Sequence, residues 1–287
     1  MKSQPKYVFL SLLVIATLLS AATFQPALAQ SAPALGAAST FAVLGGQAVT
    51  CTDSVITGDV GVSPTPAFTN TRCTIAGGIP PATNTAAATA RTGFLSAYDA
   101  LALVPCTQTI STAAFTGNVP VLGPLAPGVY CFPAAVTFTD TTLTLDGSTN
   151  PNGIWIFKVG AALTGSGFQI VMANGAQACN VFWSVGAAVT LSTSTLPPLF
   201  QGTILAGNAT GGSITIAGGS MIGRALANVA VTLTGTNLHG SCALVAQAGG
   251  GCAVDTDDNH RKDHDEDRDH EGRDKEKDHE KEKDRDR

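Results

Sequence analysis

Short segments in which apolar residues alternate with threonine or serine run through most of the chain. Val136–Phe138, Val189–Leu191, Ile214–Ile216 and Val231–Leu233 share this pattern. Because successive side chains of a β-strand point to opposite faces, the alternation predicts strands that are buried on one face only. Valine, isoleucine, leucine and phenylalanine are then expected to fill a core, while threonine faces outward.

The alternating segments recur along the chain. Val159–Thr164, which reads Val-Gly-Ala-Ala-Leu-Thr, reappears 26 residues later as Val185–Thr190 with one substitution. A repeated unit of this length is typical of a solenoid, in which the units must stack because one strand cannot bury its face alone. The outward threonines Thr137, Thr164, Thr190, Thr215 and Thr232 follow one another at intervals of 27, 26, 25 and 17 residues.

Parallel stacking aligns equivalent side chains about 4.7–4.9 Å apart, so the threonines are expected to form columns on a flat face. The expected columns are, first, Thr137, Thr164, Thr190, Thr215 and Thr232, second, Thr139, Ser166, Ser192, Ala217 and Thr234, and third, past the strand end, Thr142, Thr195, Ser220 and Asn237. Ser166 is placed loosely, because the Thr164 unit looks one residue short. The alternative interpretation is that threonine is simply a favourable surface residue of strands.

One segment departs from the alternation and predicts a helix over residues 83–104. It is rich in alanine, Pro80 and Pro81 precede it, and Pro105 follows it. Six residues share one face at helical spacing: Ala87, Ala90, Phe94, Ala97, Tyr98 and Leu101. We expect this face to pack on the β body and to hold no cofactor.

The N-terminus has the features of a secretory signal. Lys2 and Lys6 lie at the start of an apolar stretch, Val8–Leu19, and Ala27–Ala29 supplies small residues for cleavage. The apolar stretch is short compared with the roughly 20 residues of a membrane-spanning helix. We therefore expect a signal peptide at 1–29, a solenoid domain at 30–250, a disordered charged tail at 251–287, and an extracellular protein with no membrane span.

Charge is concentrated in the tail. Residues 255–287 contain 16 of the 21 acidic and 10 of the 16 basic residues, and no apolar residue follows Val254. Such a segment cannot bury a core and is interpreted as a solvated tether. Weak metal binding by His260, His264, His270 and His279 is the alternative. The rest of the chain has no basic patch that suits nucleic acid.

Seven cysteines in an exported chain predict disulfides with one cysteine left over. The sequence does not determine the pairing. Cys51 with Cys73 and Cys106 with Cys131 are the first candidates, because each pair is close in sequence. The remaining cysteines are Cys179, Cys242 and Cys252, and the absence of a CxxC motif argues against a zinc site.

The chain offers little for catalysis. Parallel solenoids include pectin-degrading enzymes, but glycoside hydrolysis requires two opposed carboxylates. Outside the tail there is no glutamate, and Asp53 and Asp59 are the only close aspartate pair in a strand region. A Ser/His/Asp triad would depend on His239, the single histidine outside the tail. We expect a binding protein without cofactor, metal or enzymatic activity.

An ordered set of motifs covers nearly all of residues 35–242: Leu35–Gly45, Thr57–Pro64, Leu125–Tyr130, Leu143–Gly147, Ile154–Phe157, Asn174–Trp183 and Gly202–Ala206. This set resembles the ice-binding protein family of the DUF3494 type. The resemblance implies a right-handed β-solenoid of triangular section, with one long helix alongside and a flat face that binds ice. Some members carry a Thr-Ala/Gly-x-Thr/Asn motif on that face, which Thr234–Asn237 matches.

Two hypotheses for function follow. The first is an ice-binding, antifreeze-type protein that contacts ice through the twelve hydroxyl and amide residues Thr137, Thr139, Thr142, Thr164, Thr190, Ser192, Thr195, Thr215, Ser220, Thr232, Thr234 and Asn237. The second is a cell-surface or matrix adhesin that uses the same rigid body and the charged tail. Faceting of ice crystals by the purified protein would distinguish them.

Overall fold

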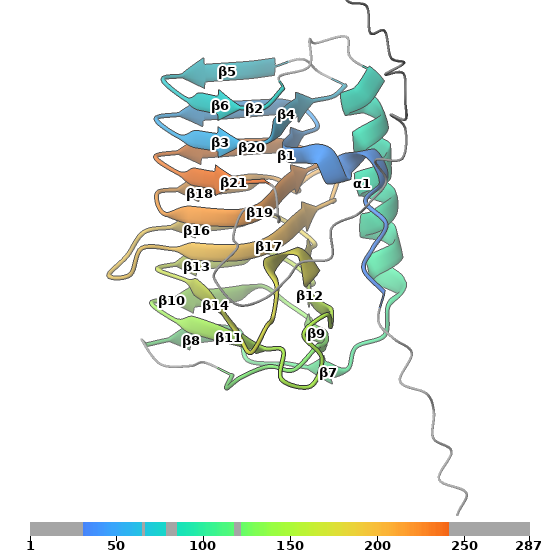
Figure 1. Ribbon diagram of the computed structural model, residues 1–287, viewed down its shortest axis with the longest axis vertical. Helices are drawn as coiled ribbons and strands as arrows, with labels where there is room; N and C mark the ends of the chain where they lie inside the picture. The colour runs from blue at the N-terminus through green and yellow to red at the C-terminus, as the bar shows by residue number, and fades with distance from the viewer. Residues whose placement is uncertain (1–30, 65–66, 79–84, 118–121, 241–287) are drawn as a thin grey trace, which may run out of the picture. The chain divides into compact units, whose positions relative to one another are not determined.

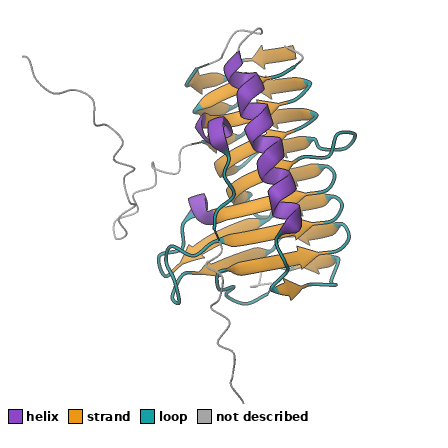
Figure 2. Cartoon of the chain, turned by 90° about the vertical axis from the view of Figure 1, so that its right-hand side faces the viewer, coloured by secondary structure: helices purple, strands orange, loops and turns teal. Residues whose placement is uncertain are grey.

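The protein is a parallel β-solenoid with one α-helix along its side. The computed structural model describes residues 31–64, 67–78, 85–117 and 122–240 (Figures 1 and 2). Successive turns of the chain, here called coils, pair strand by strand in parallel. The fold class expected from the alternating pattern is confirmed.

The first sheet contains eight strands in the order β5, β2, β20, β18, β16, β13, β10, β8. Their bounds are Ala67–Thr71, Ala48–Thr52, Ala230–Thr234, Ile214–Ala217, Val189–Ser192, Leu163–Ser166, Val136–Thr139 and Ala114–Thr116. Buried and more accessible residues alternate in these strands, as in β10 and β18. Because the outer side of this sheet is rich in threonine, we call it the threonine face.

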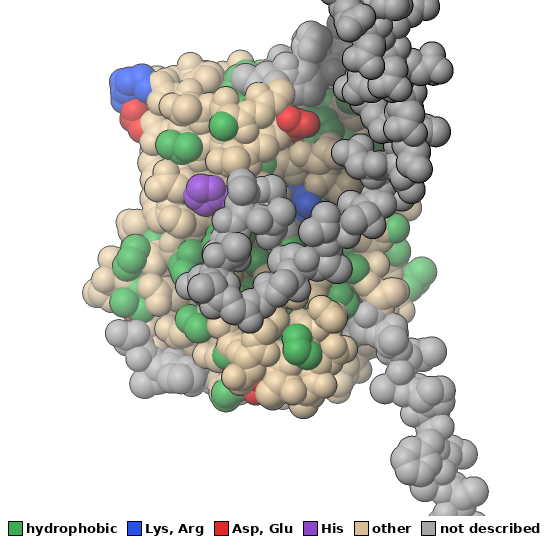
Figure 3. Space-filling model, in the orientation of Figure 1, with side chains coloured by type: hydrophobic (Ala, Val, Ile, Leu, Met, Phe, Trp, Pro, Cys, Tyr) green, Lys and Arg blue, Asp and Glu red, His purple; other side chains and the backbone are tan. Residues whose placement is uncertain are grey.

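A second face follows around the next corner. It contains β6 (Thr74–Ala76), β3 (Val55–Thr57), β21 (Asn237–His239), the first parts of β19 (Ser220–Ala227) and β17 (Leu199–Ala206), β14 (Gln169–Ala173) and β11 (Thr142–Asp146). Figure 3 views the molecule with His239, the only histidine of the described residues, in purple.

The third face is buried on both sides over its central strands. It is formed by β4 (Asp59–Val62), β1 (Phe41–Gly45), the second parts of β19 and β17, β15 (Val181–Val185), β12 (Trp155–Val159), β9 (Gly128–Phe132) and β7 (Gln108–Thr109). Strands β17 and β19 bend onto it at Gly202 and Gly223, which adopt positive φ angles. A sheet covered on both sides favours continuous apolar strands, and β9 and β15 are buried at every residue.

The coils do not stack in chain order. The two N-terminal coils, with strands β1 to β6, lie on the last C-terminal coil, since β2 pairs with β20 and β3 with β21. Helix α1 then carries the chain to the opposite end, where β7 and β8 begin the next coils (Figure 1). This contact between the β regions before and after the helix was not predicted from the sequence.

Helix α1 spans Thr85–Leu103 within the predicted segment 83–104, of which residues 83 and 84 lie outside the described residues. Its buried residues are Ala87, Ala90, Phe94, Ala97 and Leu101, and Tyr98 is partly buried against the same cluster. These side chains pack on outward residues of the third face such as Phe182, Leu205 and Leu226. The expected packing of this helix face on the β body is therefore confirmed.

Polar contacts fix the helix at several points. Near its C-terminus, Lys158 Nζ donates hydrogen bonds of 2.8 Å to the carbonyl oxygens of Ala102 and Val104, which a helix end leaves without partners. Arg91 Nη2 donates to Asn228 Oδ1, and Asn228 Nδ2 donates to the Gly207 carbonyl. The side chains of β12 and the loop after β19 thus hold a helix that is distant in sequence.

Aromatic side chains stack along the inside of the solenoid. The ring of Phe138 lies 4.3 Å from Phe168 and 5.1 Å from Phe115, centroid to centroid. Phe168 occupies the space next to Gly165, because a Cβ at Gly165 would lie 3.0 Å from the Phe168 Cβ. The interpretation of this unit as one residue short was wrong: β13 keeps full register with β10 and β16.

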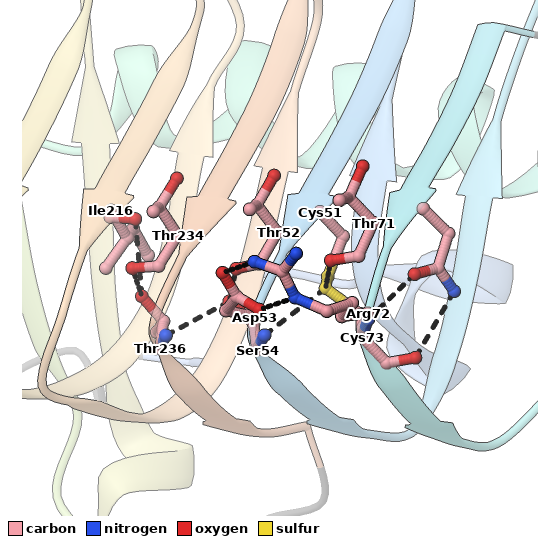
Figure 4. Close-up of a disulfide and its surroundings, with 11 residues drawn as sticks. Cys51, Thr52, Asp53, Ser54, Thr71, Arg72, Cys73, Ile216, Thr234 and Thr236 are labelled. Carbon is pink, nitrogen blue, oxygen red and sulfur yellow. Dashed lines mark hydrogen bonds and ion pairs between the residues drawn. A yellow bond between two sulfur atoms is a disulfide. The ribbon is translucent and has the colours of Figure 1, made fainter.

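Two disulfides confirm the first candidates from sequence. Cys51 bonds to Cys73 between the two N-terminal coils (Figure 4), and Cys106, just after the helix, bonds to Cys131 in β9. Cys179 lies in the short 3-10 helix η2 (Ala178–Asn180). Cys242 and Cys252 lie outside the described residues.

Several expectations fall outside the part of the chain that the structure describes. These are the signal peptide at 1–29, residues 241–250 of the expected domain, and the tail at 251–287. Within the described residues, no helix has the length and hydropathy to cross a membrane.

Close contact between the helix and the N-terminal segment yields a stability prediction. A Cβ at Gly93 would lie 2.5 Å from the Leu35 carbonyl oxygen, a backbone atom that cannot move alone. We expect Gly93→Val to destabilise the fold by about 1–3 kcal/mol, despite the higher helix propensity of valine. Urea unfolding measures this change. Ser96→Ala, on an exposed site of the same helix, is the control and should change stability by less than about 0.5 kcal/mol. Equal stabilities of the two variants would contradict the packing.

Candidate functional site

The threonine face carries two long columns of small hydroxyl residues. In the first, strand register joins Thr69, Thr50, Thr232, Thr215, Thr190, Thr164 and Thr137 without interruption, and Ala114 follows at the end. In the second, register joins Thr71, Thr52, Thr234, Ala217, Ser192, Ser166, Thr139 and Thr116. The two columns predicted from the sequence contain fewer residues, and the predicted order of those residues is confirmed.

The N-terminal coils lengthen both columns beyond the prediction. Thr50 pairs with Thr232, and Thr52 pairs with Thr234. Figure 4 shows the side chains of Thr234, Thr52 and Thr71 pointing to the same side of the sheet. The segments Ala48–Thr52 and Ala67–Thr71 contain the same outward threonines at alternate positions, and this local signal was available in the sequence.

The surface around the columns is uncharged. Alanine lies beside the first column at the strand start, where Ala67, Ala48 and Ala230 are in register. None of the described residues in the eight strands is charged. Beneath them, Phe138, Leu191, Ile216 and Leu233 are buried. The inward direction predicted for these apolar residues is therefore confirmed, and the threonines rest on a close-packed core.

The ridge, which we define as the corner between the threonine face and the second face, turns through left-handed backbone conformations. Seven of its corners begin with a residue of positive φ, between +48° and +118°: Arg72, Asp53, Gly235, Gly218, Gly167, Asp140 and Gly117. Glycine and aspartate suit this region of φ better than most residues. The turn reverses which side chain faces inward, so Thr236 is buried after exposed Thr234.

The motif Thr234–Asn237 therefore spans the ridge. Thr234 ends β20 on the threonine face, and Asn237 begins β21 on the second face. Between them, the Thr236 hydroxyl donates to the Ile216 carbonyl at 3.2 Å, and the Thr236 amide donates to Ser54 Oγ at 3.0 Å. The first and last residues of the motif are thus accessible, while the third has a structural role.

The predicted third column is wrong at Thr195. Register on the second face joins Thr142, Gln169, Leu199, Ser220, Asn237, Val55 and Thr74. Thr195 lies in the loop between β16 and β17, and Leu199 occupies the position expected for it. The loop has six residues where the corners described in full have two, which the spacing of Thr195 from Ser192 did not reveal. Thr142, Ser220 and Asn237 lie beyond the ridge, in the first column of the second face.

The second face is chemically mixed. Val55 and Val171, 41% and 39% exposed, are two of the three large exposed hydrophobic residues among the described residues. Ile222, Gln201 and His239 also point outward from its strands. By contrast, the threonine face repeats threonine at one outward position in seven neighbouring strands.

Asp53, Asp59, Asp140 and Asp146 have structural partners. Asp53 accepts two hydrogen bonds from the guanidinium of Arg72, and Asp59 Oδ1 accepts one from the Gly78 amide at 2.7 Å. Asp146 accepts from Asn174 Nδ2 and from Ser148. The aspartate pair weighed for catalysis, Asp53 and Asp59, therefore has a structural role at the corners of the coils. No group of three potential metal ligands occurs within the described ranges.

Hydrogen bonding depresses the pKa of three of these carboxyls. Thr195, together with Leu196 and Ser194, holds the pKa of Asp140 below its ordinary value of 3.8. The Arg72 guanidinium does the same for Asp53, and Asn174 with Ser148 for Asp146. All three groups are therefore charged at neutral pH, and their partners lie on other strands or loops.

Comparison with known proteins places this geometry in context. A family model described as Ice-binding-like matches residues 43–239. An ice-binding protein of Nostoc sp. (strain HG1) is 37% identical over 235 residues, which cover 80% of this chain and 82% of the relative. An ice-binding protein of Flavobacterium frigoris (strain PS1) is 35% identical over 215 residues, with 69% of this chain and 73% of the relative covered.

A solved structure shows the same fold. The ice-binding protein from the Antarctic ascomycete Antarctomyces psychrotrophicus aligns with a TM-score of 0.64 at 31% identity. The alignment covers 73% of this chain and 98% of that chain. Both the sequence and the arrangement of coils and helix are thus shared with proteins of this group.

The depressed carboxyl pKa values predict acid sensitivity. A group whose pKa is lower in the folded state stabilises the fold above its unfolded pKa, and this stabilisation is lost as the pH falls through the folded pKa. Melting temperature should therefore stay nearly constant from neutral pH to about 5 and fall below about 4. Thermal unfolding between pH 7 and pH 2 measures this profile. Asp140→Asn should lower the melting temperature at pH 7 and flatten the fall in acid. A parent profile that stays flat down to pH 2 would contradict the assignment.

Proposed function

The chain belongs to the ice-binding-like family, and we propose that its threonine face adsorbs to ice as an extracellular antifreeze-type protein. The observation that carries this proposal is the unbroken register of seven threonines, from Thr69 to Thr137, in one column. A second column of threonine, serine and alanine runs beside it.

An array of this kind suits an ordered water lattice. Parallel strands repeat about every 4.7–4.9 Å, so the hydroxyl and methyl groups of the column repeat at that spacing. The β-branch of threonine restricts χ1, and stiff side chains lose little conformational entropy when they bind. Strong charges would orient water around themselves, and the described strand residues of this face contain none.

The other two faces are less suitable. Helix α1 and the segment before β1, with Leu35 and Ala38, cover the outer side of the third face. The second face mixes valine, leucine, isoleucine, glutamine and histidine with only a few threonines. Neither presents one small hydroxyl residue in register over successive coils.

Export also forms part of the proposal. The signal features of residues 1–29 direct the chain out of the cell, where disulfides such as Cys51–Cys73 and Cys106–Cys131 are stable. A binding role without catalysis fits the family and the structural use of the aspartates. The adhesin alternative depends on the charged tail, which lies outside the described residues.

A bulky substitution at the centre of the face tests the proposal. Thr215 is exposed in β18, near the middle of the first column. We expect Thr215→Tyr to raise a ring above the flat surface and abolish most ice shaping and thermal hysteresis. Stability should change by only about 0.5 kcal/mol, because no buried contact is altered. Thr232→Tyr, in the next strand, should have the same effect.

The matched control is Thr144→Tyr, an outward position of β11 on the second face. It should keep the activity of the parent. Activity lost in Thr144→Tyr and kept in Thr215→Tyr would move the site to the second face. A parent protein that neither shapes ice nor lowers the freezing point would refute ice binding altogether.

We also propose that the charged tail is independent of the ice site. Removing residues 255–287 takes away no apolar side chain, so neither the melting temperature nor thermal hysteresis should change appreciably. Comparison of the truncated and full-length proteins by thermal unfolding and freezing-point measurement checks this. A large loss of stability in the truncated protein would show that the tail packs on the solenoid.

A further inference from the structure

The threonine face ends in an edge strand at the N-terminal coils. Strand β5 is the terminal strand of the eight-stranded sheet and pairs with β2 alone among the described strands. Figure 1 shows β5 at this end of the stack. Phe68 is partly buried against the core, and the other residues of β5 are exposed. Such an edge offers backbone donors and acceptors to another strand.

The outward-directed backbone groups of this edge belong to Phe68 and Asn70. The Thr71 carbonyl accepts a hydrogen bond from the Asp53 amide at 2.9 Å, so Thr71 directs its carbonyl towards β2. Because alternate residues of a strand bond to opposite neighbours, the amides and carbonyls of Phe68 and Asn70 point away from β2. The Asn70 side chain accepts from the Cys73 amide at 2.8 Å and donates to the Cys73 carbonyl at 3.3 Å. These side-chain bonds do not use the Asn70 backbone.

The edge coil is fastened to the coil beside it. The disulfide Cys51–Cys73 joins the two N-terminal coils, and the Arg72 guanidinium donates two hydrogen bonds to the Asp53 carboxylate (Figure 4). Terminal elements with few contacts fray easily, and these two links oppose fraying at the end of β5. A strand that is already ordered loses less conformational entropy when it pairs with another strand.

Strand β5 is complementary to a second copy of itself. Phe68 and Asn70 lie one residue on either side of Thr69, so a two-fold axis through Thr69 places Phe68 opposite the Asn70 of the second copy. In antiparallel pairing such residues exchange both of their backbone hydrogen bonds, and the axis generates this pair twice. On the outer side, Thr69 then lies opposite its own counterpart.

Charge and packing favour this occupant. Strand β5 contains no charged residue and no proline, the residues by which natural edge strands avoid pairing. On the inner side, the two Phe68 rings become diagonal neighbours about 7–8 Å apart, within reach of aromatic side chains. They cover the end of the core, where Phe68, Ile75 and Val62 are only partly buried. A second copy therefore supplies both the backbone partners and the apolar cover.

We propose that the protein forms a symmetric dimer in which the β5 edges of two copies pair antiparallel and join their eight-stranded sheets into one. Because the axis stands perpendicular to the sheet, both threonine faces lie on the same side. The threonine columns of the two copies meet at Thr69, and the threonine surface doubles in length. The dimer itself does not depend on ice binding, whereas the use of the longer surface rests on the proposed function.

Sedimentation of the purified protein over its soluble concentration range tests the dimer. We expect a monomer–dimer equilibrium for the parent. Thr69→Lys and Thr69→Glu each place like charges opposite one another and should raise the dissociation constant about tenfold or more. Both variants should fold, since the Thr69 side chain is exposed. An equimolar mixture of the two variants pairs lysine with glutamate and should restore the dimer.

The matched control is Thr116→Lys, an exposed position of β8, the terminal strand at the opposite edge of the same sheet. It should dimerise like the parent. A parent that stays monomeric at its highest soluble concentration, open-ended assemblies larger than a dimer, or a mixture of the Thr69 variants that stays monomeric would each overturn the inference. A dimer that persists in SDS without reductant is linked through cysteine and also overturns it.

Thermal hysteresis of the same samples separates this inference from the proposed function. A parent that sediments as a dimer without lowering the freezing point refutes ice binding and leaves the dimer standing. A monomeric parent that lowers the freezing point refutes the dimer and leaves ice binding standing.

Discussion

In-register stacking of parallel coils is the constraint on which the structure depends. Each inner strand of the threonine face takes its backbone partners from the coil above and the coil below, so equivalent residues must lie directly over one another. The same hydrogen bonds that hold the coils together therefore set the spacing of Thr190, Thr215 and Thr232. A regular outer surface follows from the way the backbone satisfies its hydrogen bonds, with no further adjustment of the side chains.

Helix α1 makes this stack possible, because it carries the chain from the N-terminal coils at one end of the solenoid to the opposite end. By covering the third face, α1 buries outward residues such as Phe182 and Leu226 that would otherwise be exposed. Lys158 and Asn228 fix the helix to coils far from it in sequence. The N-terminal coils can then lie on β20 and β21 and extend the columns. The helix thus contributes to the length of the threonine face, although it lies on another side of the molecule.

Charge is used sparingly and away from the threonine face. Asp53 and Asp140 both lie at ridge corners, where aspartate tolerates a positive φ and its carboxylate accepts hydrogen bonds across coils. Their depressed pKa values reflect these contacts. The strands between the corners are left with small neutral residues, which is the surface that adsorption to a neutral lattice requires. Corner chemistry and face chemistry are separated within each coil.

The sequence by itself determined the properties that depend on neighbouring residues. Period-two alternation identified the outward direction of Thr137 and Thr190, because side-chain direction in a strand is local. Tertiary structure decided which coils meet. The pairing of Thr50 with Thr232 joins residues far apart in the chain, and only the return of the chain along α1 brings them together. The spacing of Thr195 from Ser192 matches that of an ordinary corner, yet the next strand begins at Leu199. The reason is that the coils above and below fix the register of a strand, which the number of residues along the chain does not determine.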